Sequence, residues 1–240
     1  MMFKRYFIVL GVVLIGCLVS VPVWAEEDSG AKEEVDYTTL SPEELADHLI
    51  FKTDSFDLEQ DVQEGGTARQ RMEQDKLQKV CSQLKGRRAG QEEVQQLHAD
   101  ARASIEYPEA GIELGDWEKG NEIARSGYGY RIGHKYDSHK KNSVGGNCYA
   151  CHQMDPEEIT FGTIGPSLAG YGKLRGNNEA MRQYVYEVIY NPHAYFVCTH
   201  MPRFGESGFL TQDDILDVMA YLLDPASPVN ANFQADSEQE

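Results

Sequence analysis

The feature that most constrains this chain is the sequence CYACH at residues 148–152. C-x-x-C-H is the attachment pattern of a c-type haem. Cys148 and Cys151 can both form thioether bonds to the vinyl groups of one porphyrin, and His152 is then held beneath the iron as its proximal ligand. The alternatives are a chance match or half of a zinc site, but zinc needs a second Cys/His pair at similar spacing, which the sequence lacks. The single motif predicts one covalently bound haem c.

The charge of the chain restricts its partners. The 240 residues carry a formal net charge of −17, which argues against nucleic acid and anionic membrane surfaces and suits a basic patch on another protein. A solvated acidic surface accounts for most of these charges. One basic stretch, residues 125–147, precedes the haem motif. It is either a docking surface or a solvated loop.

Residues 1–25 have the pattern of a secretory signal peptide. Two basic residues precede an apolar run over residues 7–19, and the small-residue cleavage site VWA occupies residues 23–25. The run is short for a membrane span. A second interpretation stays open, because the sequence LIGC ending at Cys17 resembles a lipoprotein cleavage box that would put lipid on Cys17. Either form of processing exports the protein to a compartment where disulfides are permitted.

Two cysteines of the exported chain lie outside the haem motif, Cys81 and Cys198. An even pair in an oxidising compartment predicts a disulfide between them. Two separate free thiols, or a reactive Cys198 near the haem, are the alternatives.

Helical patterns run through the rest of the chain, without a convincing strand. Residues 26–111 are expected to form an acidic leader and a helical extension. Capping boxes begin at Ser41 and Thr67, and the helix that Thr67 opens is expected to continue to Leu84. A helix over residues 92–105 would pair with it as an antiparallel hairpin.

Residues 112–230 are expected to form an all-α haem domain, followed by a C-terminal tail at 231–240. Helical patterns cover residues 117–125 and 181–189, and Thr211 caps a last helix that crosses the first one. The haem motif should open a short helix that stops near residue 155. No helix is expected after the last one.

The imidazole of a haem-ligating histidine is usually oriented by a carbonyl that accepts its Nδ1–H. A Gly-Pro turn follows the attachment motif, and the carbonyl of Pro166 is predicted to orient His152.

A methionine on a proline-braced loop is predicted to be the sixth iron ligand, and Met201 in the sequence MPRFG fits this description. Five other side chains compete for the position, namely Met154, Met181, Met219, His193 and His200. The first lies too close to the attachment helix, and the next two lie within helical apolar stripes typical of a core. The two histidines would instead give a bis-His haem.

The haem domain resembles class I cytochromes c in its element order and ligands. It resembles more closely the SoxX subunit of the SoxAX cytochromes of bacterial sulfur oxidation. The resemblance is carried by residues 146–152, 162–172, 191–193, 201–205 and 217–230. The strings GPSLAGYG and MPRFG are much more specific than C-x-x-C-H alone.

The resemblance implies a periplasmic heterodimer with a SoxA-type cytochrome subunit. In that family the complex couples thiosulfate oxidatively to a cysteine of the SoxYZ carrier protein, and SoxX passes the electrons to a downstream cytochrome acceptor. The chain would then be a non-catalytic subunit of an L-cysteine S-thiosulfotransferase, and it has no residue that we would name as catalytic.

Two functions of other classes stay open. One is a free-standing soluble monohaem electron carrier, although such a shuttle does not need the helical extension. The other is a ligand-binding or peroxidase-type haem with an open sixth site.

Overall fold

The computed structural model describes residues 35–63, 65–84, 90–131 and 143–234. Within these ranges every regular element is helical, and the β-structure is an isolated bridge between Asp61 and Thr67. The predicted all-α fold class is confirmed. No helix of the described ranges is long and apolar enough to cross a membrane. The predicted signal peptide, Cys17 and residues 132–142 of the basic stretch before the haem motif lie outside the described residues.

The chain divides into two compact units, Met1–Leu45 and Ala46–Glu240. The described part of the first unit contains the 3-10 turn η1, Tyr37–Thr39, and the beginning of α1, Pro42–Asp47. The predicted capping box at Ser41 is confirmed, because Ser41 N–H donates to Glu44 Oε2 (2.8 Å) and Glu44 N–H donates to Ser41 Oγ (3.2 Å). The second unit opens with the π-helical turn η2, His48–Lys52.

The helical extension of the second unit contains α2, Ala68–Met72, α3, Lys76–Gln83, and α4, Gln91–Ala103. The prediction of one helix from Thr67 to Leu84 is wrong. Asp75 forms a second capping box and starts a separate helix there. Lys76 at the beginning of α3 pairs with Asp100 near the end of α4 at 2.9 Å, which fits the antiparallel arrangement expected for these helices.

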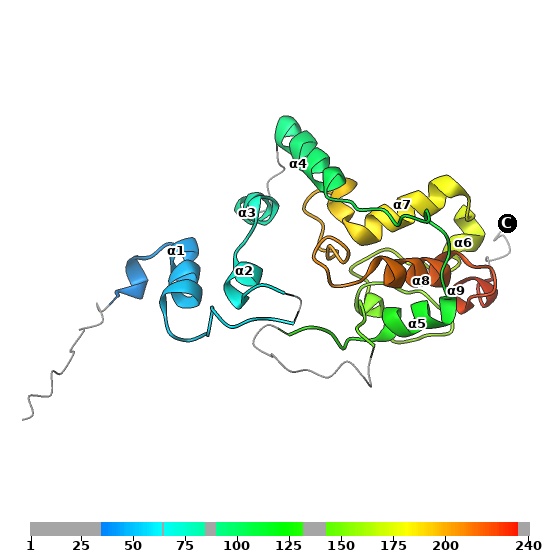
Figure 1. Ribbon diagram of the computed structural model, residues 1–240, viewed down its shortest axis with the longest axis horizontal. Helices are drawn as coiled ribbons and strands as arrows, with labels where there is room; N and C mark the ends of the chain where they lie inside the picture. The colour runs from blue at the N-terminus through cyan, green and yellow to red at the C-terminus, as the bar shows by residue number, and fades with distance from the viewer. Residues whose placement is uncertain (1–34, 64, 85–89, 132–142, 235–240) are drawn as a thin grey trace, which may run out of the picture. The chain divides into compact units, whose positions relative to one another are not determined.

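Residues 112–230, the predicted haem domain, are organised around the crossing of α5, Trp117–Arg125, and α8, Gln212–Leu223 (Figure 1). This crossing was predicted from the sequence. A Cβ added at Gly120 would lie 2.0 Å from the carbonyl oxygen of Asp217, so the two backbones approach more closely than any larger residue permits. The side chain of Asp217 also accepts the backbone N–H of Asp116, the α5 cap, at 2.7 Å. Asp217 of α8 therefore contacts α5 at two neighbouring points, Gly120 and the backbone N–H of Asp116.

The remaining elements of the domain are η3, Cys148–Ala150; α6, Tyr171–Arg175; α7, Glu179–Tyr190; η4, Pro192–Ala194; and α9, Pro228–Ala231. The expected attachment helix reaching residue 155 is wrong, because only the 3-10 turn η3 forms. The backbone after it pairs with residues 162–168 instead of continuing a helix.

The prediction that no helix follows α8 is also wrong, because a short helix, α9, forms there. α9 docks on the end of α8, with Val229 fully buried. The Asn230 amide donates to the carbonyls of Leu222 and Asp224, and Ser227 Oγ donates to Tyr221 O. These bonds satisfy carbonyls at the C-terminal end of α8 that have no partner within the helix. The C-terminal part of the domain therefore closes the core.

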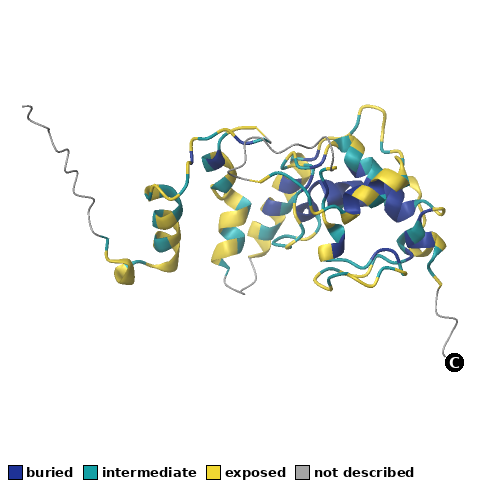
Figure 2. Ribbon diagram, turned by 90° about the horizontal axis from the view of Figure 1, so that it is seen from below, coloured by how far each residue is buried: buried dark blue, intermediate teal, exposed yellow. Residues whose placement is uncertain are grey.

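The core lies around α8 (Figure 2). The sequence predicts one apolar face on this helix, but its second half is buried almost all round, Ala220 and Tyr221 included. The cause is that α5, α6, α7 and α9 all pack against it. Within the extension, α3 has no buried residue, whereas α4 buries Leu97 and Ala101.

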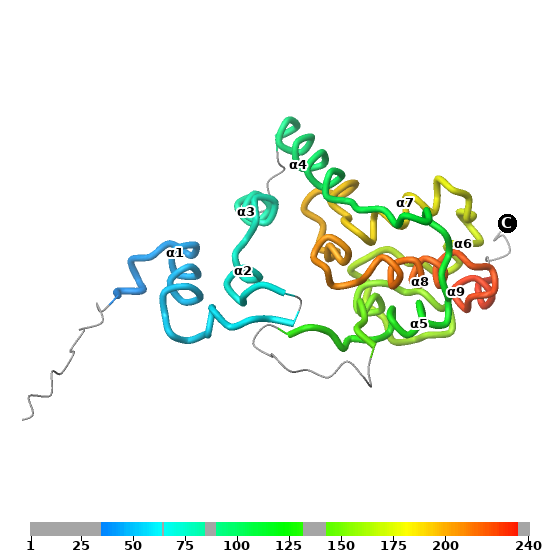
Figure 3. Tube along the Cα trace, viewed as in Figure 1, coloured from blue at the N-terminus to red at the C-terminus, as the bar shows by residue number. Residues whose placement is uncertain are grey.

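The chain between α4 and α5 passes alongside α7 (Figure 3). Its Tyr107 hydroxyl donates to the buried carboxylate of Glu187 at 2.7 Å, and Tyr195 and Gln183 also donate to that carboxylate. Burial favours the neutral acid, but the hydrogen bonds from Tyr195, Tyr107 and Gln183 outweigh it and lower the pKa of Glu187. Glu187 therefore joins three segments as a carboxylate.

Gly120→Ala tests the helix crossing. Alanine favours a helix by about 1 kcal/mol over glycine, but its Cβ would collide with Asp217 and force α5 away from α8. We expect a net loss of about 1–3 kcal/mol in the free energy of unfolding, measured with denaturant on the haem-loaded protein. Gly90→Ala is the matched control, because a Cβ there meets nothing within 4 Å. Equal stability of the two variants would contradict the close crossing.

Glu187→Gln tests the buried carboxylate. The folded protein lowers the pKa of Glu187, so its stabilisation is complete above the unfolded pKa of about 4.3 and is lost as the pH falls through the folded pKa. The variant should be less stable than wild type by about 1–3 kcal/mol at neutral pH. This gap should narrow in acid, as measured by denaturant midpoints at several pH values. A gap that widens in acid would refute the assignment. Glu113→Gln is the control, because Glu113 is an exposed partner of Arg182. It should change the free energy of unfolding little.

Candidate haem site

The haem motif is attached to the C-terminal end of α5 by backbone hydrogen bonds. Gly146 N–H donates to Ile123 O and Asn147 N–H donates to Ser126 O, both at 3.0 Å. Asn147 adopts a left-handed conformation with φ of 47°, which asparagine tolerates better than most residues. The chain therefore turns sharply from the end of α5 into the first cysteine.

Tyr149, inside the motif, anchors it to the core. Its buried hydroxyl lies 2.7 Å from the hydroxyl of Tyr221 on α8, and it accepts the backbone N–H of Asp155 at 3.0 Å. The guanidinium of Arg125 lies 4.6 Å from the Tyr149 ring centroid and also pairs with Glu158. Sequence reasoning missed this anchor, because the middle positions of C-x-x-C-H carry no chemical requirement. Arg125, at the edge of the basic stretch, is engaged in these contacts.

His152 is oriented by the carbonyl of Pro166, which lies 2.7 Å from its Nδ1. A carbonyl can only accept, so Nδ1 carries a proton, and in the neutral imidazole Nε2 then has the lone pair. This is the tautomer that a metal-ligating histidine needs. Pro166 is the residue whose carbonyl was expected in this place.

The segment that contains Pro166 runs beside the motif in register. The N–H groups of Gly162, Gly165 and Leu168 donate to the carbonyls of residues 149, 151 and 153, each at 2.8 Å. A Cβ added at Gly165 would lie 2.2 Å from Cε1 of His152, so glycine leaves the space that the imidazole fills. The segment GTIGPS, residues 162–167, therefore fixes the position of the His152 ring.

The two thiols of the motif are free. Burial raises the pKa of the Cys148 thiol to about 12. A Cβ added at Gly146 would lie 3.4 Å from Cys148 Sγ and 3.3 Å from the ring of Phe204, three residues after Met201. The chain just after Met201 therefore lies close to the attachment motif. Two free thiols beside an imidazole with an available Nε2 fit a covalently held haem.

Met201 is partly buried against the core, and its N–H donates to Thr199 Oγ1 at 3.3 Å. Of its rivals, Met154 and Met219 are fully buried, and Met181 is partly buried on α7. His200 is exposed. The ring of His193 is buried and its Nδ1 accepts the backbone N–H of Cys198 at 3.1 Å.

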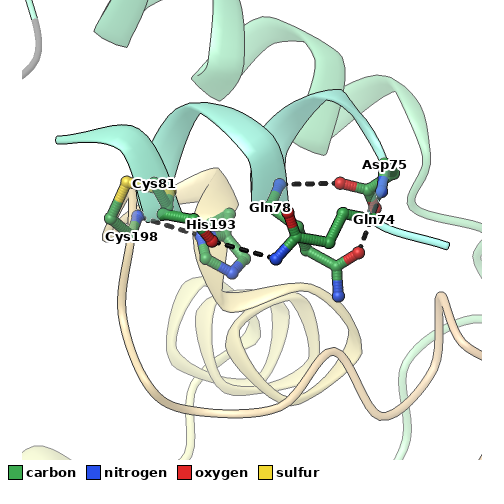
Figure 4. Close-up of a disulfide and its surroundings, with 7 residues drawn as sticks. Gln74, Asp75, Gln78, Cys81, His193 and Cys198 are labelled. Atoms are coloured by element: carbon green, nitrogen blue, oxygen red, sulfur yellow. Dashed lines mark hydrogen bonds between the residues drawn. A yellow bond between two sulfur atoms is a disulfide. The ribbon is translucent and has the colours of Figure 1, made fainter. Parts of the chain in front are cut away.

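The structure contains a disulfide between Cys81 on α3 and Cys198, the pair expected from the sequence. Their Cα atoms are 5.4 Å apart. Figure 4 shows this bond beside His193, with the capped beginning of α3 close by. The disulfide joins the extension to the chain three residues before Met201.

The chain is similar to known cytochromes c over the residues that contain the haem motif. Residues 140–224 match the sequence profile of the cytochrome c family. An "uncharacterized lipoprotein" of Aquifex aeolicus (strain VF5) is 45% identical over 159 residues, which cover 65% of this chain and 73% of that protein.

A solved structure of SoxXA from P. pantotrophus is similar to 50% of this chain and 89% of its own, with 24% identity and a TM-score of 0.34. This likeness is too weak to bear on the fold or the function. The chain belongs to the family of the Aquifex aeolicus protein, and its cytochrome c domain makes it a c-type cytochrome with covalently bound haem c.

Proposed function

We propose that this chain is the electron-accepting subunit of a periplasmic SoxAX-like complex. It carries one haem c, bound through Cys148 and Cys151, with His152 and Met201 as the axial ligands of the iron. The complex couples thiosulfate oxidatively to a cysteine of a SoxYZ-like carrier protein. This subunit takes the electrons and passes them to a downstream cytochrome.

One observation carries the proposal. Of the two strings that mark the SoxX resemblance, residues 162–172 lie against the haem motif and orient His152. The other string, residues 201–205, contains Met201, the ligand that we propose for the opposite side of the iron. Haem supplies one-electron redox chemistry, and a His/Met ligand pair favours electron transfer over oxygen chemistry. Backbone pairing holds the segment with the two thiols, the Pro166 carbonyl orients the imidazole of His152, and Met201 would supply the thioether.

The extension supports a subunit over a free shuttle. Residues 46–111 belong to the same compact unit as the cytochrome c domain, and a small electron carrier has no use for such an addition. Export is part of the proposal. The description of the Aquifex aeolicus relative as a lipoprotein supports the alternative in which Cys17 carries lipid, and the mass of the mature N-terminus distinguishes the two forms.

The function is tested by isolating the tagged, haem-loaded chain from the periplasm of its own host. A stoichiometric second cytochrome, and reduction of the haem by thiosulfate once the carrier protein is added, are the expected results. A monomer that only other cytochromes reduce would identify a free-standing carrier instead. Pyridine haemochrome analysis should count one haem in this chain.

Gly165→Ala tests the proximal side. The added methyl group would overlap the His152 ring, so the ring must turn and lose the hydrogen bond to Pro166. We expect a lower yield of haem-loaded protein and a changed midpoint potential in the part that is loaded. Ile164→Ala is the matched control, because Ile164 is 75% exposed. A potential and yield equal to wild type in Gly165→Ala would contradict the proximal arrangement.

Met201→Leu tests the distal side. Leucine keeps the apolar volume but has no sulfur, so the methionine-to-iron charge-transfer band of the ferric protein should disappear and the midpoint potential should fall. Met181→Leu removes a rival methionine and should keep the band. Persistence of the band in Met201→Leu would show that another residue ligates the iron.

A further inference from the structure

The extension contacts the chain on both sides of Met201. We call residues 193–207 the methionine segment. As the residue numbers of this segment rise, those of its partners in the extension fall. The partners lie first on α4, then on α3, then at the α3 cap and finally on α2. A monotonic order of this kind means that the two stretches run antiparallel to each other. The disulfide is therefore one contact in a series.

Before Met201 there are two attachments. His98 on α4 donates from Nδ1 to the carbonyl of His193 at 3.0 Å. Cys81 is bonded to Cys198, whose backbone is left-handed with φ of 59°, an unfavourable conformation for a residue with a side chain. Nδ1 of the buried His193 ring accepts the backbone N–H of Cys198 and so stabilises this turn.

After Met201 there are two more attachments. Arg203 Nη1 lies 2.7 Å from Asp75 Oδ2. The same Asp75 carboxylate caps α3 by accepting the N–H of Gln78 at 2.8 Å, so the ion pair is fixed to the beginning of a helix. Arg71 on α2 donates from Nη1 to the carbonyl of Ser207 at 3.1 Å.

A methionine thioether is a weak ligand on a loop, and its hold on iron competes with opening of that loop. Attachments on both sides of the ligand reduce the conformational freedom that the loop gains when it opens. They therefore favour the ligated state, as supporting contacts do at other ligand sites.

We propose that the extension is a positioning element that holds the methionine segment in the conformation that presents Met201 to the haem iron. Cys81, Asp75 and Arg71 are its positioning residues. This inference rests on the proposed His/Met ligation and assigns to α2 and α3 a role that the ligation alone does not require.

Two variants of the full, haem-loaded chain test the inference. Asp75→Asn removes the charge that pairs with Arg203 and keeps the disulfide, and asparagine caps a helix as well as aspartate does. The double variant Cys81→Ser/Cys198→Ser removes the bridge and keeps the ion pair. The probe is imidazole, which binds ferric iron only after the methionine has left.

The rate of imidazole binding should rise about two- to fivefold in Asp75→Asn, because half-exposed ion pairs contribute modestly. In the double variant it should rise on the order of tenfold, since the covalent restraint is lost. The methionine-to-iron charge-transfer band should weaken in the same order. Asp100→Asn is the control: it breaks the ion pair with Lys76 inside the extension and should leave rate and band unchanged.

Wild-type imidazole rates and a full band in both variants would overturn the inference and leave the Met201 ligation intact. Absence of the band from the wild-type protein would overturn the ligation and this inference together. If the double variant does not fold, Asp75→Asn decides alone, because it keeps the disulfide.

Discussion

The contact of α5 with α8 at Gly120 is the constraint on which the haem domain depends. Only glycine allows the α5 backbone to lie against the Asp217 carbonyl. Each helix then supplies one support for the haem motif, since the end of α5 pairs with Gly146 and Asn147 and Tyr221 of α8 bonds to Tyr149. A displacement between the two helices would pull these supports apart. The position of the thiols follows from the helix crossing.

The two sides of the candidate iron site have different supports. On the proximal side His152 is held by backbone pairing within the domain and by the carbonyl of Pro166. On the side that we propose to be distal, the residues around Met201 are attached to α2 and α3 of the extension by a disulfide, an ion pair and a hydrogen bond from Arg71. The proposed proximal ligand, His152, is therefore held by the core of the domain, while the proposed distal ligand, Met201, lies in a segment held by the extension.

The sequence predicts what depends on local patterns. The boxes at Ser41 and Thr67 and the stripe of α8 recur in the structure. The break before α3 has a readable signal, an aspartate three residues before a glutamine, but the apolar spacing on either side conceals it. Tyr149 and the order of the contacts around Met201 could not be predicted, because they join residues far apart in the chain and no local period encodes such pairs.

The composition of the extension explains why it is joined covalently. α3 buries no residue and α2 buries only Ala68, so apolar burial contributes little to holding them in place. The ion pair between Asp75 and Arg203 is partly exposed to solvent and contributes modestly to stability. A disulfide across 117 positions removes about 4–5 kcal/mol of chain entropy from the unfolded state. We therefore expect α2 and α3 to stay docked where thiols oxidise and to detach where they do not, which ties the attachment of α3 to the export of the chain.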